Sequence, residues 1–177
     1  IISGPLMDVA MNKRDGFRRG NRDPIHAPQG CYPCKGDDDW ITISITSDEE
    51  WNNFTNALGN PEWNTDSRFA TNDSRIKSHD TLDEYIGAWT SERDKMEIMQ
   101  LLQNAGVPAG AVLKSKEVLL NEHYRARNYW ELGMHPAETN IGGRWYGGLP
   151  FKMSRTGGRI RRATAPLGYD TRYILEE

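Results

Sequence analysis

Two cysteines with a two-residue gap, Cys31 and Cys34, are the residues whose spacing most directly indicates chemistry. This gap occurs in redox pairs, where the first thiolate lies at a helix N-terminus, and in zinc sites, which need two further Cys or His ligands. The segment after the pair is acidic and leads into a strand pattern, so no helix is expected there. The available histidines are scattered along the chain: His26, His79, His123 and His135. A coincidental spacing is therefore favoured over a redox or metal function.

Other residues capable of chemistry also have simpler explanations. Three consecutive aspartates at 37–39 suit a hard cation, but they lack the glycine and distal glutamate of a calcium loop, which favours a solvated turn. His123 and His135 are candidate general bases, yet the sequence places no Ser, Cys or Asp to form a triad with either. The glycine pairs after residue 140 do not open a predicted helix, as a phosphate-binding loop would. No catalytic residue and no metal site is predicted within the chain.

The elements that position these residues begin with a strand and a helix. Residues 40–45 alternate isoleucine with Thr and Ser, which predicts a half-buried strand. Ser47 and Glu50 then form a candidate capping box, and the helix that they open ends at Gly59. Its apolar stripe consists of Trp51, Phe54 and Leu58.

Two further helices and several short elements are predicted in the middle of the chain. One helix begins near Thr81, where Glu84 offers a reciprocal cap, and the other follows Ser91 and ends at Gly106. Beyond them the pattern predicts a strand at 107–113, a helical turn at 115–121 and a strand entry at 130–134.

Both ends of the chain have a different character from the middle. Residues 1–12 are mildly helical, and 13–35 are rich in Gly, Pro, Arg and Asp, which predicts an extended arm. After Pro136 the pattern predicts short strands and arms with no compact helix. Isolated strands mixed with helix pairs predict an α+β fold, not a doubly wound parallel sheet. We expect a small domain with a short mixed or antiparallel sheet and several helices, flanked by extended linker arms.

Composition limits the class of protein further. Only 37% of the 177 residues are hydrophobic and the mean hydropathy is -0.75, so part of the stabilising surface is expected to belong to a partner. No apolar run of about 18 residues and no signal-peptide pattern is present, which argues against a membrane partner. Two cysteines do not make a disulfide framework, which predicts a cytoplasmic location. Because the chain starts without Met, we expect trimming or a fragment.

Charge is distributed unevenly around a net value of -3. Basic residues gather at 13–22 and 152–162, whereas the middle is acidic. Such patches suit nucleic acid, the phosphates of CoA or an acidic partner surface. A subunit or domain interface is favoured over direct phosphate contact, because Arg is enriched at interfaces. Nucleic acid is the least favoured partner, since the net charge is negative and no groove-reading motif is present.

Several unusual segments occur in the order found in one enzyme family. They are Asn21-Arg22-Asp23-Pro24, Ala27-Pro28-Gln29-Gly30, Asp66-Ser67-Arg68-Phe69-Ala70-Thr71-Asn72 with Arg75 following, Ala-Gly-Val-Pro-Ala-Gly-Ala-Val at 105–112, and a Gly-, Pro- and Arg-punctuated stretch at 142–168. Together they resemble the second half of the family III CoA-transferases. That group includes formyl-CoA transferase, carnitine CoA-transferase and alpha-methylacyl-CoA racemase.

The resemblance implies an architecture larger than this chain. In the family, an N-terminal domain binds CoA and carries the aspartate nucleophile, a small domain is inserted through long linkers, and two subunits interlock as rings. The chain then divides into an N-terminal helix and linker arm at 1–35, a small α+β domain at 36–135 and a return segment with short strands at 136–177. The partners implied are a CoA thioester as substrate, the N-terminal half of the enzyme and a second copy in a homodimer, with no covalently bound cofactor.

The resemblance also implies the position of the substrate site. The family's glycine-rich active-site loop falls at 23–29, which here reads Asp-Pro-Ile-His-Ala-Pro-Gln and lacks the glycine run. A different acyl group and a racemase-like member therefore both stay open. The substrate-binding residues predicted on this basis are His26, Ala27, Gln29 and Gly30. At the other end, Leu-Gly-Tyr-Asp-Thr at 167–171 replaces the family's usual Leu-Gly-Glu-His ending, which weakens any role attached to that Glu-His pair.

The function implied is that of the C-terminal portion of a CoA-transferase or acyl-CoA racemase, inactive without the N-terminal half. A thioester is exchanged through a carboxylate nucleophile, and the family's nucleophile lies outside these residues. The alternative is a free-standing binding or dimerisation module derived from that family.

Overall fold

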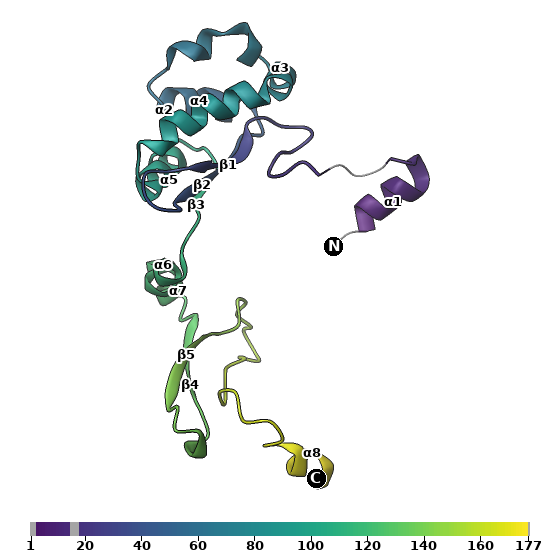
Figure 1. The fold of residues 1–177 in the computed structure, drawn as a ribbon, viewed down its shortest axis with the longest axis vertical. Coiled ribbons are helices and arrows are strands. Elements are labelled where there is room, and N and C mark those ends of the chain that lie inside the picture. The colour runs from purple at the N-terminus through teal and green to yellow at the C-terminus, as the bar shows by residue number, and fades with distance from the viewer. Residues whose placement is uncertain (1–2, 15–17, 177) are drawn as a thin grey trace. The chain divides into compact units, whose positions relative to one another are not determined.

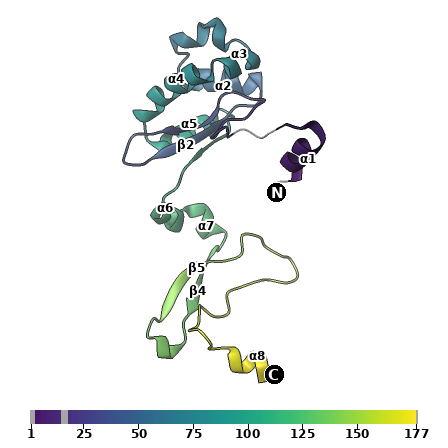
Figure 2. The ribbon, with the colours of Figure 1, turned by 45° about the vertical axis from the view of Figure 1, so that its right-hand side comes forward.

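The computed structural model of this chain describes residues 3–14 and 18–176. It forms two compact units, the first ending at Val112 and the second beginning at Leu113 (Figures 1 and 2). The first unit contains helix α1 (Ser3–Asn12), where the sequence indicates mild helicity, and a three-stranded sheet with four further helices.

The sheet of the first unit is antiparallel, with the order β1-β2-β3. Its strands are β1 (Gln29–Pro33), β2 (Trp40–Ser44) and β3 (Ala109–Ala111). Ile41 and Ile43 of β2 are buried while Thr42 is exposed, as the alternation predicts. Two expectations require correction, because β1 forms within the predicted arm and the strand predicted at 107–113 covers three residues only.

Four helices and two 3-10 turns accompany the sheet, with α4 packed against β1 and α5 against β2 and β3. The helices are α2 (Asp48–Ala57), α3 (Asn72–Lys77), α4 (His79–Ser91) and α5 (Lys95–Asn104), and the 3-10 turns are Glu62–Thr65 and Ser67–Phe69. The cap at Ser47 is confirmed, since its side chain accepts a hydrogen bond from the Glu50 N–H. Helix α4 begins at His79, close to the predicted Thr81, and α5 follows Ser91 with Asp94 as its N-cap. The reciprocal cap predicted for Glu84 is wrong, since the N-cap of α4 is Ser78, which makes no side-chain hydrogen bond.

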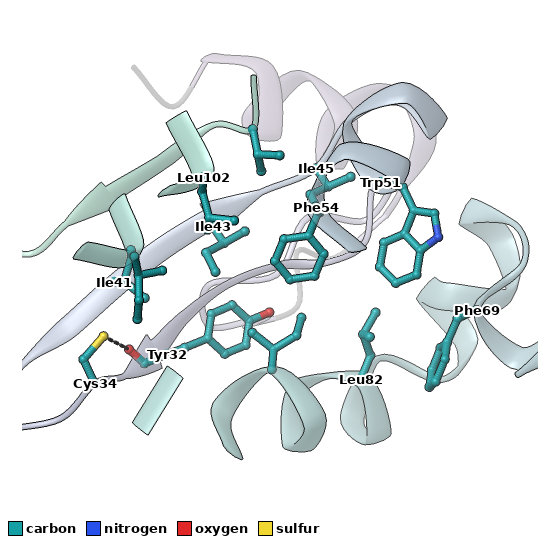
Figure 3. Packing of buried hydrophobic residues seen from close by; sticks show 13 residues of the cluster. Tyr32, Cys34, Ile41, Ile43, Ile45, Trp51, Phe54, Phe69, Leu82 and Leu102 are labelled. Atoms are coloured by element: carbon teal, nitrogen blue, oxygen red, sulfur yellow. Dashed lines mark hydrogen bonds between the residues drawn. The ribbon is translucent and has the colours of Figure 1, made fainter. Parts of the chain in front are cut away.

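The core of the first unit lies between the sheet and these helices (Figure 3). Its members come from the sheet, the helices and the turns, and the Tyr32 hydroxyl reaches Asp83 of α4: Tyr32, Cys34, Ile41, Ile43, Ile45, Trp51, Phe54, Phe69, Leu82, Ile86, Ile98, Leu102 and Val107. The stripes at period 3.6 in α2, α4 and α5 supply six of these thirteen residues. Among the described residues, all of the buried hydrophobic side chains except Ala163 lie in this unit.

The second unit contains a two-stranded antiparallel sheet and three short helices. Helices α6 (Ser115–Leu120) and α7 (Glu122–Ala126) precede β4 (Trp130–Met134), which pairs with β5 (Gly143–Gly147) so that Leu132 faces Trp145. A 3-10 turn, Ala137–Thr139, lies between the strands. The expectation of no compact helix in the tail is wrong, since α8 (Thr171–Glu176) forms there.

Two small antiparallel sheets combined with separate helices confirm the α+β class. Of the mixed and antiparallel arrangements expected from the sequence, the structure has the antiparallel one. Within the described part of the chain, no helix has the length and apolar character needed to cross a membrane.

Candidate functional site

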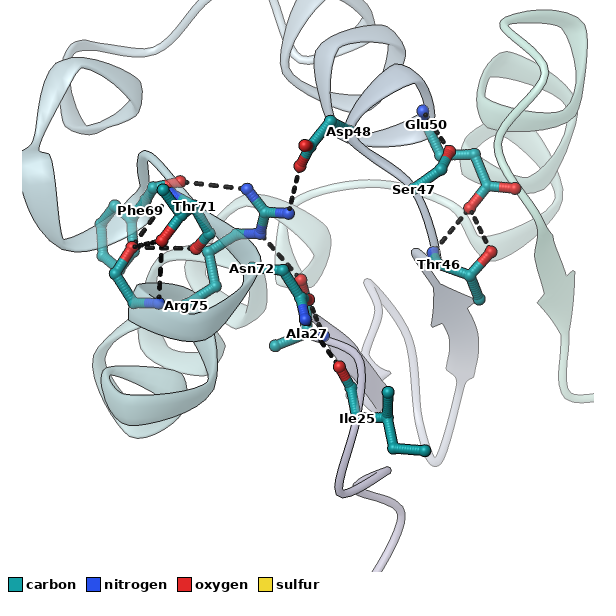
Figure 4. A network of polar contacts seen from close by, with 11 residues as sticks. Ile25, Ala27, Thr46, Ser47, Asp48, Glu50, Phe69, Thr71, Asn72 and Arg75 are labelled. Atoms are coloured by element: carbon teal, nitrogen blue, oxygen red, sulfur yellow. Dashed lines mark hydrogen bonds and ion pairs between the residues drawn. The ribbon is translucent and has the colours of Figure 1, made fainter.

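The segment from Asp23 to Gly30 holds all four predicted substrate-binding residues, and two helices fix its backbone. Asn72, the first residue of α3, donates from Nδ2 to the Ile25 carbonyl at 2.6 Å and accepts from the Ala27 N–H at 3.1 Å (Figure 4). One amide side chain thus satisfies a donor and an acceptor of the segment. The capping box of Thr71 and Ser74 holds the start of α3 in place for this contact.

Arg75, one turn further along α3, is the second anchor. Its guanidinium is 1% exposed and lies 4.6 Å from the centre of the Trp51 ring. Nε donates to the Ala27 carbonyl at 2.9 Å, and Nη1 donates to the Phe69 carbonyl at 3.2 Å. The charge is balanced by Asp48, 3.1 Å from Nη2. A buried cation persists only when it is paired and hydrogen-bonded, and these contacts meet that condition (Figure 4).

Asp83 of α4 is the third anchor and joins the arm to the sheet. Its Oδ1 accepts from the Tyr32 hydroxyl at 2.8 Å, and its Oδ2 pairs with Arg22 at 2.5 Å. Arg22 also reaches Asp80 at 2.7 Å. Burial, and next the Asp83 carboxylate, raise the pKa of Tyr32, so its hydroxyl remains a proton donor. The arm before β1 is therefore held on α4 by charge.

His79 completes this cluster from the first turn of α4. Its Nε2 accepts from the Gln29 N–H at 3.4 Å, which requires a lone pair on that nitrogen. Burial lowers the pKa of His79, so the imidazole stays neutral and able to accept. The backbone at Gln29 is thereby bound from outside the sheet.

The structure does not bring the four predicted substrate-binding residues into one pocket. Ala27 is fully buried and is held through its backbone. His26 lines a cavity of about 220 Å³ beside Arg75. Gln29 and Gly30 instead line a separate groove of about 510 Å³ over β1 and β2. Side-chain contact with a ligand is thus open to His26 and Gln29, and backbone contact to Gly30.

His26 is oriented by a carboxylate three residues earlier. The Asp23 Oδ1 accepts from the Ile25 and His26 N–H groups and lies 3.2 Å from the His26 Nδ1. These hydrogen bonds, first that from Ile25, hold the pKa of Asp23 below its ordinary value. Since an ionised carboxylate only accepts, Nδ1 carries the proton and Nε2 is the remaining ring nitrogen for a ligand.

The cysteine pair does not form a redox site. Cys31 is half-buried and lines the groove, whereas Cys34 is buried and donates to the Tyr32 carbonyl; neither forms a disulfide. Burial raises the pKa of Cys31, and burial together with Asp39 raises the pKa of Cys34 to about 11. Neither thiol is activated, since a reactive thiolate needs a lowered pKa.

The acidic run and His135 have structural partners. Asp39 pairs with the buried Lys95 at 2.7 Å, and Lys95 also donates to the Val112 carbonyl. His135 Nδ1 donates to the Thr164 carbonyl, and its Nε2 accepts from the Tyr146 hydroxyl at 2.6 Å. His123 is exposed on α7. Over residues 3–14 and 18–176, no group of three His, Cys, Asp or Glu side chains is placed to hold a metal.

Comparison with known proteins places these features in a family. The sequence profile of "CoA-transferase family III" matches residues 1–171. The chain is 39% identical over 112 residues to "Probable CoA-transferase Rv1866" of Mycobacterium tuberculosis, covering 63% of this chain and 14% of that protein. It is 31% identical over 160 residues to "Succinyl-CoA--D-citramalate CoA-transferase" of Chloroflexus aurantiacus, covering 90% of this chain and 39% of that protein.

The fold is also similar to that of a solved structure. A CAIB/BAIF family protein from Brucella suis superposes with a TM-score of 0.80 at 21% identity, covering 98% of this chain and 43% of that one. The chain thus spans less than half the length of these relatives. Because the family profile matches nearly the whole of it, the chain belongs to CoA-transferase family III.

Proposed function

We propose that this chain is the C-terminal portion of an enzyme that transfers CoA between acyl groups or racemises an acyl-CoA, and that it is inactive without an N-terminal half. The main support for the proposal is that the family profile matches nearly the whole chain, while the chain matches only a small part of its relatives. The family profile matches residues 1–171, yet the chain covers only 14% and 39% of the two curated relatives. The aspartate nucleophile that the resemblance implies belongs to the uncovered part.

The chemistry around Asp23 to Gly30 supports an enclosing role. Thioester exchange on a carboxylate needs a positioned nucleophile and donors for the developing oxyanion. Here two buried ionisable side chains, Arg75 and His79, are bound to backbone groups of the segment. They shape the segment and leave His26, Gln29 and the Gly30 backbone as the groups proposed to meet substrate.

The division of the chain by role belongs to the same proposal. Residues 1–35 are the N-terminal helix and linker arm, 36–135 the small domain and 136–177 the return segment, with β1 as the part of the arm that joins the sheet. The proposed partners are a CoA thioester, the N-terminal half and a second copy in a homodimer. The two free cysteines accord with a cytoplasmic location.

A reconstitution assay tests the proposal. The chain is incubated with a labelled acyl-CoA and a carboxylate acceptor, alone and with a separately produced N-terminal half from a family III enzyme. We expect no exchange or racemisation by the chain alone and turnover by the mixture. Turnover by the chain alone would refute the proposal, and a stable complex without turnover would favour the binding or dimerisation module instead.

A further inference from the structure

The second unit contains a cavity of about 440 Å³ that the proposed thioester function does not use. Helices α6 and α7 lie at one end of the β4–β5 hairpin, and all four elements contribute to its lining (Figures 1 and 2). Leu119 and Leu120 come from α6, Tyr124 from α7, and Trp130 and Trp145 from the two strands. Pockets for small molecules have volumes of about 300–1,000 Å³ and mostly apolar, aromatic walls. The size and the lining of this cavity therefore suit a small ligand.

The aromatic walls of the cavity suit a flat ring. The sheet register pairs Trp145 with Leu132, so Trp145 lies on the same face of the hairpin as Trp130. The rings of Tyr124 and Trp130 meet edge to face, with centroids 6.5 Å apart and planes at 71°. Trp145 is 62% exposed, which leaves much of a large apolar side chain in water. An aromatic ligand would cover Trp145 and meet the other rings in the offset or edge-to-face geometry that aromatic pairs prefer.

Two polar groups of the cavity are donors that lack an acceptor. In the part of the chain that the structure describes, the Trp130 Nε1 atom is buried and has no hydrogen-bond partner. Such a group is costly, and native proteins usually satisfy it. The Arg125 side chain makes no hydrogen bond or ion pair with any described residue. An indole N–H and a guanidinium only donate, so both groups require an acceptor from outside the unit.

We propose that this cavity binds a small aromatic carboxylate, whose ring packs against Trp145 and whose carboxylate accepts hydrogen bonds from the Arg125 guanidinium and the Trp130 indole N–H. The site lies within the second unit and requires neither CoA nor the N-terminal half, so it goes beyond the proposed thioester function. Its volume is in the lower part of the range for ligand pockets, which suits a ligand of one or two rings.

The charge of the cavity selects an anion. Aromatic cages often bind cations through the faces of their rings. Here Arg125 is the only charged residue among the described residues of the lining, and it would repel a cation. A carboxylate is planar and can accept two parallel hydrogen bonds from a guanidinium. An acid with a flexible alkyl chain would lose more conformational freedom on binding and would lack the ring contacts.

The test titrates the full 177-residue chain with 2-naphthoate and follows the indole N–H signals of its six tryptophans by NMR. The Trp130 signal, assigned with Trp130→Phe, should shift saturably as its N–H gains an acceptor. Arg125→Met should bind about tenfold more weakly, because a hydrogen bond between charged groups is lost. Lys116→Met is the matched control, since it removes the same charge from an exposed residue of α6 that does not line the cavity. It should bind as the wild type does.

Two further ligands supply a second measurement. 2-Naphthamide keeps the rings without the charge, and decanoate keeps the carboxylate without a ring. We expect each to bind about tenfold more weakly than 2-naphthoate, because each lacks one of the two contacts.

Three results would each overturn the proposal: no saturable shift of the Trp130 signal, equal binding by Arg125→Met and Lys116→Met, or binding of the amide or of decanoate as tight as that of 2-naphthoate. The comparison of ligands uses the wild type alone, so it decides even if Arg125→Met does not fold. Neither measurement involves a CoA ester or an N-terminal half, so its failure is distinct from failure of the thioester function.

Discussion

Gly30 and Tyr32 lie on the same face of β1, and the Tyr32 ring occupies the space that a side chain at position 30 would need. A Cβ on Gly30 would lie 2.8 Å from the Cζ and Oη of Tyr32. The ring cannot move freely, because it is buried and its hydroxyl is hydrogen-bonded to Asp83. The absence of a side chain at Gly30 thus permits the contact between β1 and α4.

Gly30→Ala should therefore displace the Tyr32 ring and weaken the hydrogen bond to Asp83. We expect the free energy of unfolding to fall by about 1–3 kcal/mol, the usual cost of overpacking. Urea denaturation monitored by tryptophan fluorescence measures it. Gly87→Ala in α4 is the control, since a Cβ there meets no atom within 4 Å, and helix propensity predicts equal or greater stability. A Gly30→Ala chain as stable as the wild type would contradict the packing described.

Removing the Arg75 side chain should have a larger effect. Arg75→Met leaves the buried carbonyls of Ala27 and Phe69 without donors and removes the cation from the Trp51 ring. We expect a loss of about 3–5 kcal/mol, and faster hydrogen exchange at the Ala27 amide. Arg68→Met is the matched control, because Arg68 is half exposed and pairs with Asp66 at the surface. That change should destabilise the chain far less, because a surface ion pair contributes little; similar losses for the two variants would show that Arg75 is not an anchor.

The elements with strong periodicity were predictable from the sequence, and those formed by distant pairing were not. β2 and α2 follow directly from alternation and from the Ser47 cap. β1 has no apolar alternation, with Gln29, Gly30 and a terminal Pro33, and it becomes a strand because β2 supplies its partners. Helix α3 has six residues, too few for a periodic signal.

At the candidate site, too, the local segment was predictable from the sequence and the distant contacts were not. The resemblance led to the segment that holds His26 and Gln29, but the side chains that fix its backbone lie about fifty residues later. The contact of Asn72 with Ile25 spans 47 residues and that of Arg75 with Ala27 spans 48. No local pattern reveals such contacts. The only signal was that Asn72 and Arg75 belong to one of the segments that carry the resemblance.

The two cysteines should differ in reactivity. Cys31 lines the groove, whereas Cys34 is buried with its pKa raised to about 11. At pH 8 we expect iodoacetamide to modify Cys31 slowly and Cys34 only after unfolding, because the thiolate is the reactive form. Mass spectrometry of the native and urea-unfolded chain measures both sites. Rapid alkylation of Cys34, or a disulfide between the two under mild oxidation, would contradict the structure.

Stability should decrease in mild acid through His79. Burial lowers the pKa of His79 in the folded chain below its unfolded value of about 6.5, so the unfolded chain binds more protons. The contribution of His79 to the free energy of unfolding is complete above about pH 6.5 and is lost as the pH falls below that value toward the folded pKa. Protonation of the ring also removes the acceptor of the Gln29 N–H. The free energy of unfolding, measured by denaturation between pH 8 and pH 5, should fall less with decreasing pH in His79→Gln than in the wild type. His123→Gln, at an exposed site on α7, should follow the wild type; identical slopes for all three chains would exclude His79 as the cause.

We propose that the reacting carboxylate lies outside these 177 residues. The most direct measurement is peptide mapping of the acyl label after a reconstituted mixture of this chain and an N-terminal half is quenched during turnover with a radiolabelled acyl-CoA. We predict label on a carboxylate of the N-terminal half and none on any peptide of this chain. An acyl group recovered on an Asp or Glu within residues 1–177 would show that this chain carries the nucleophile.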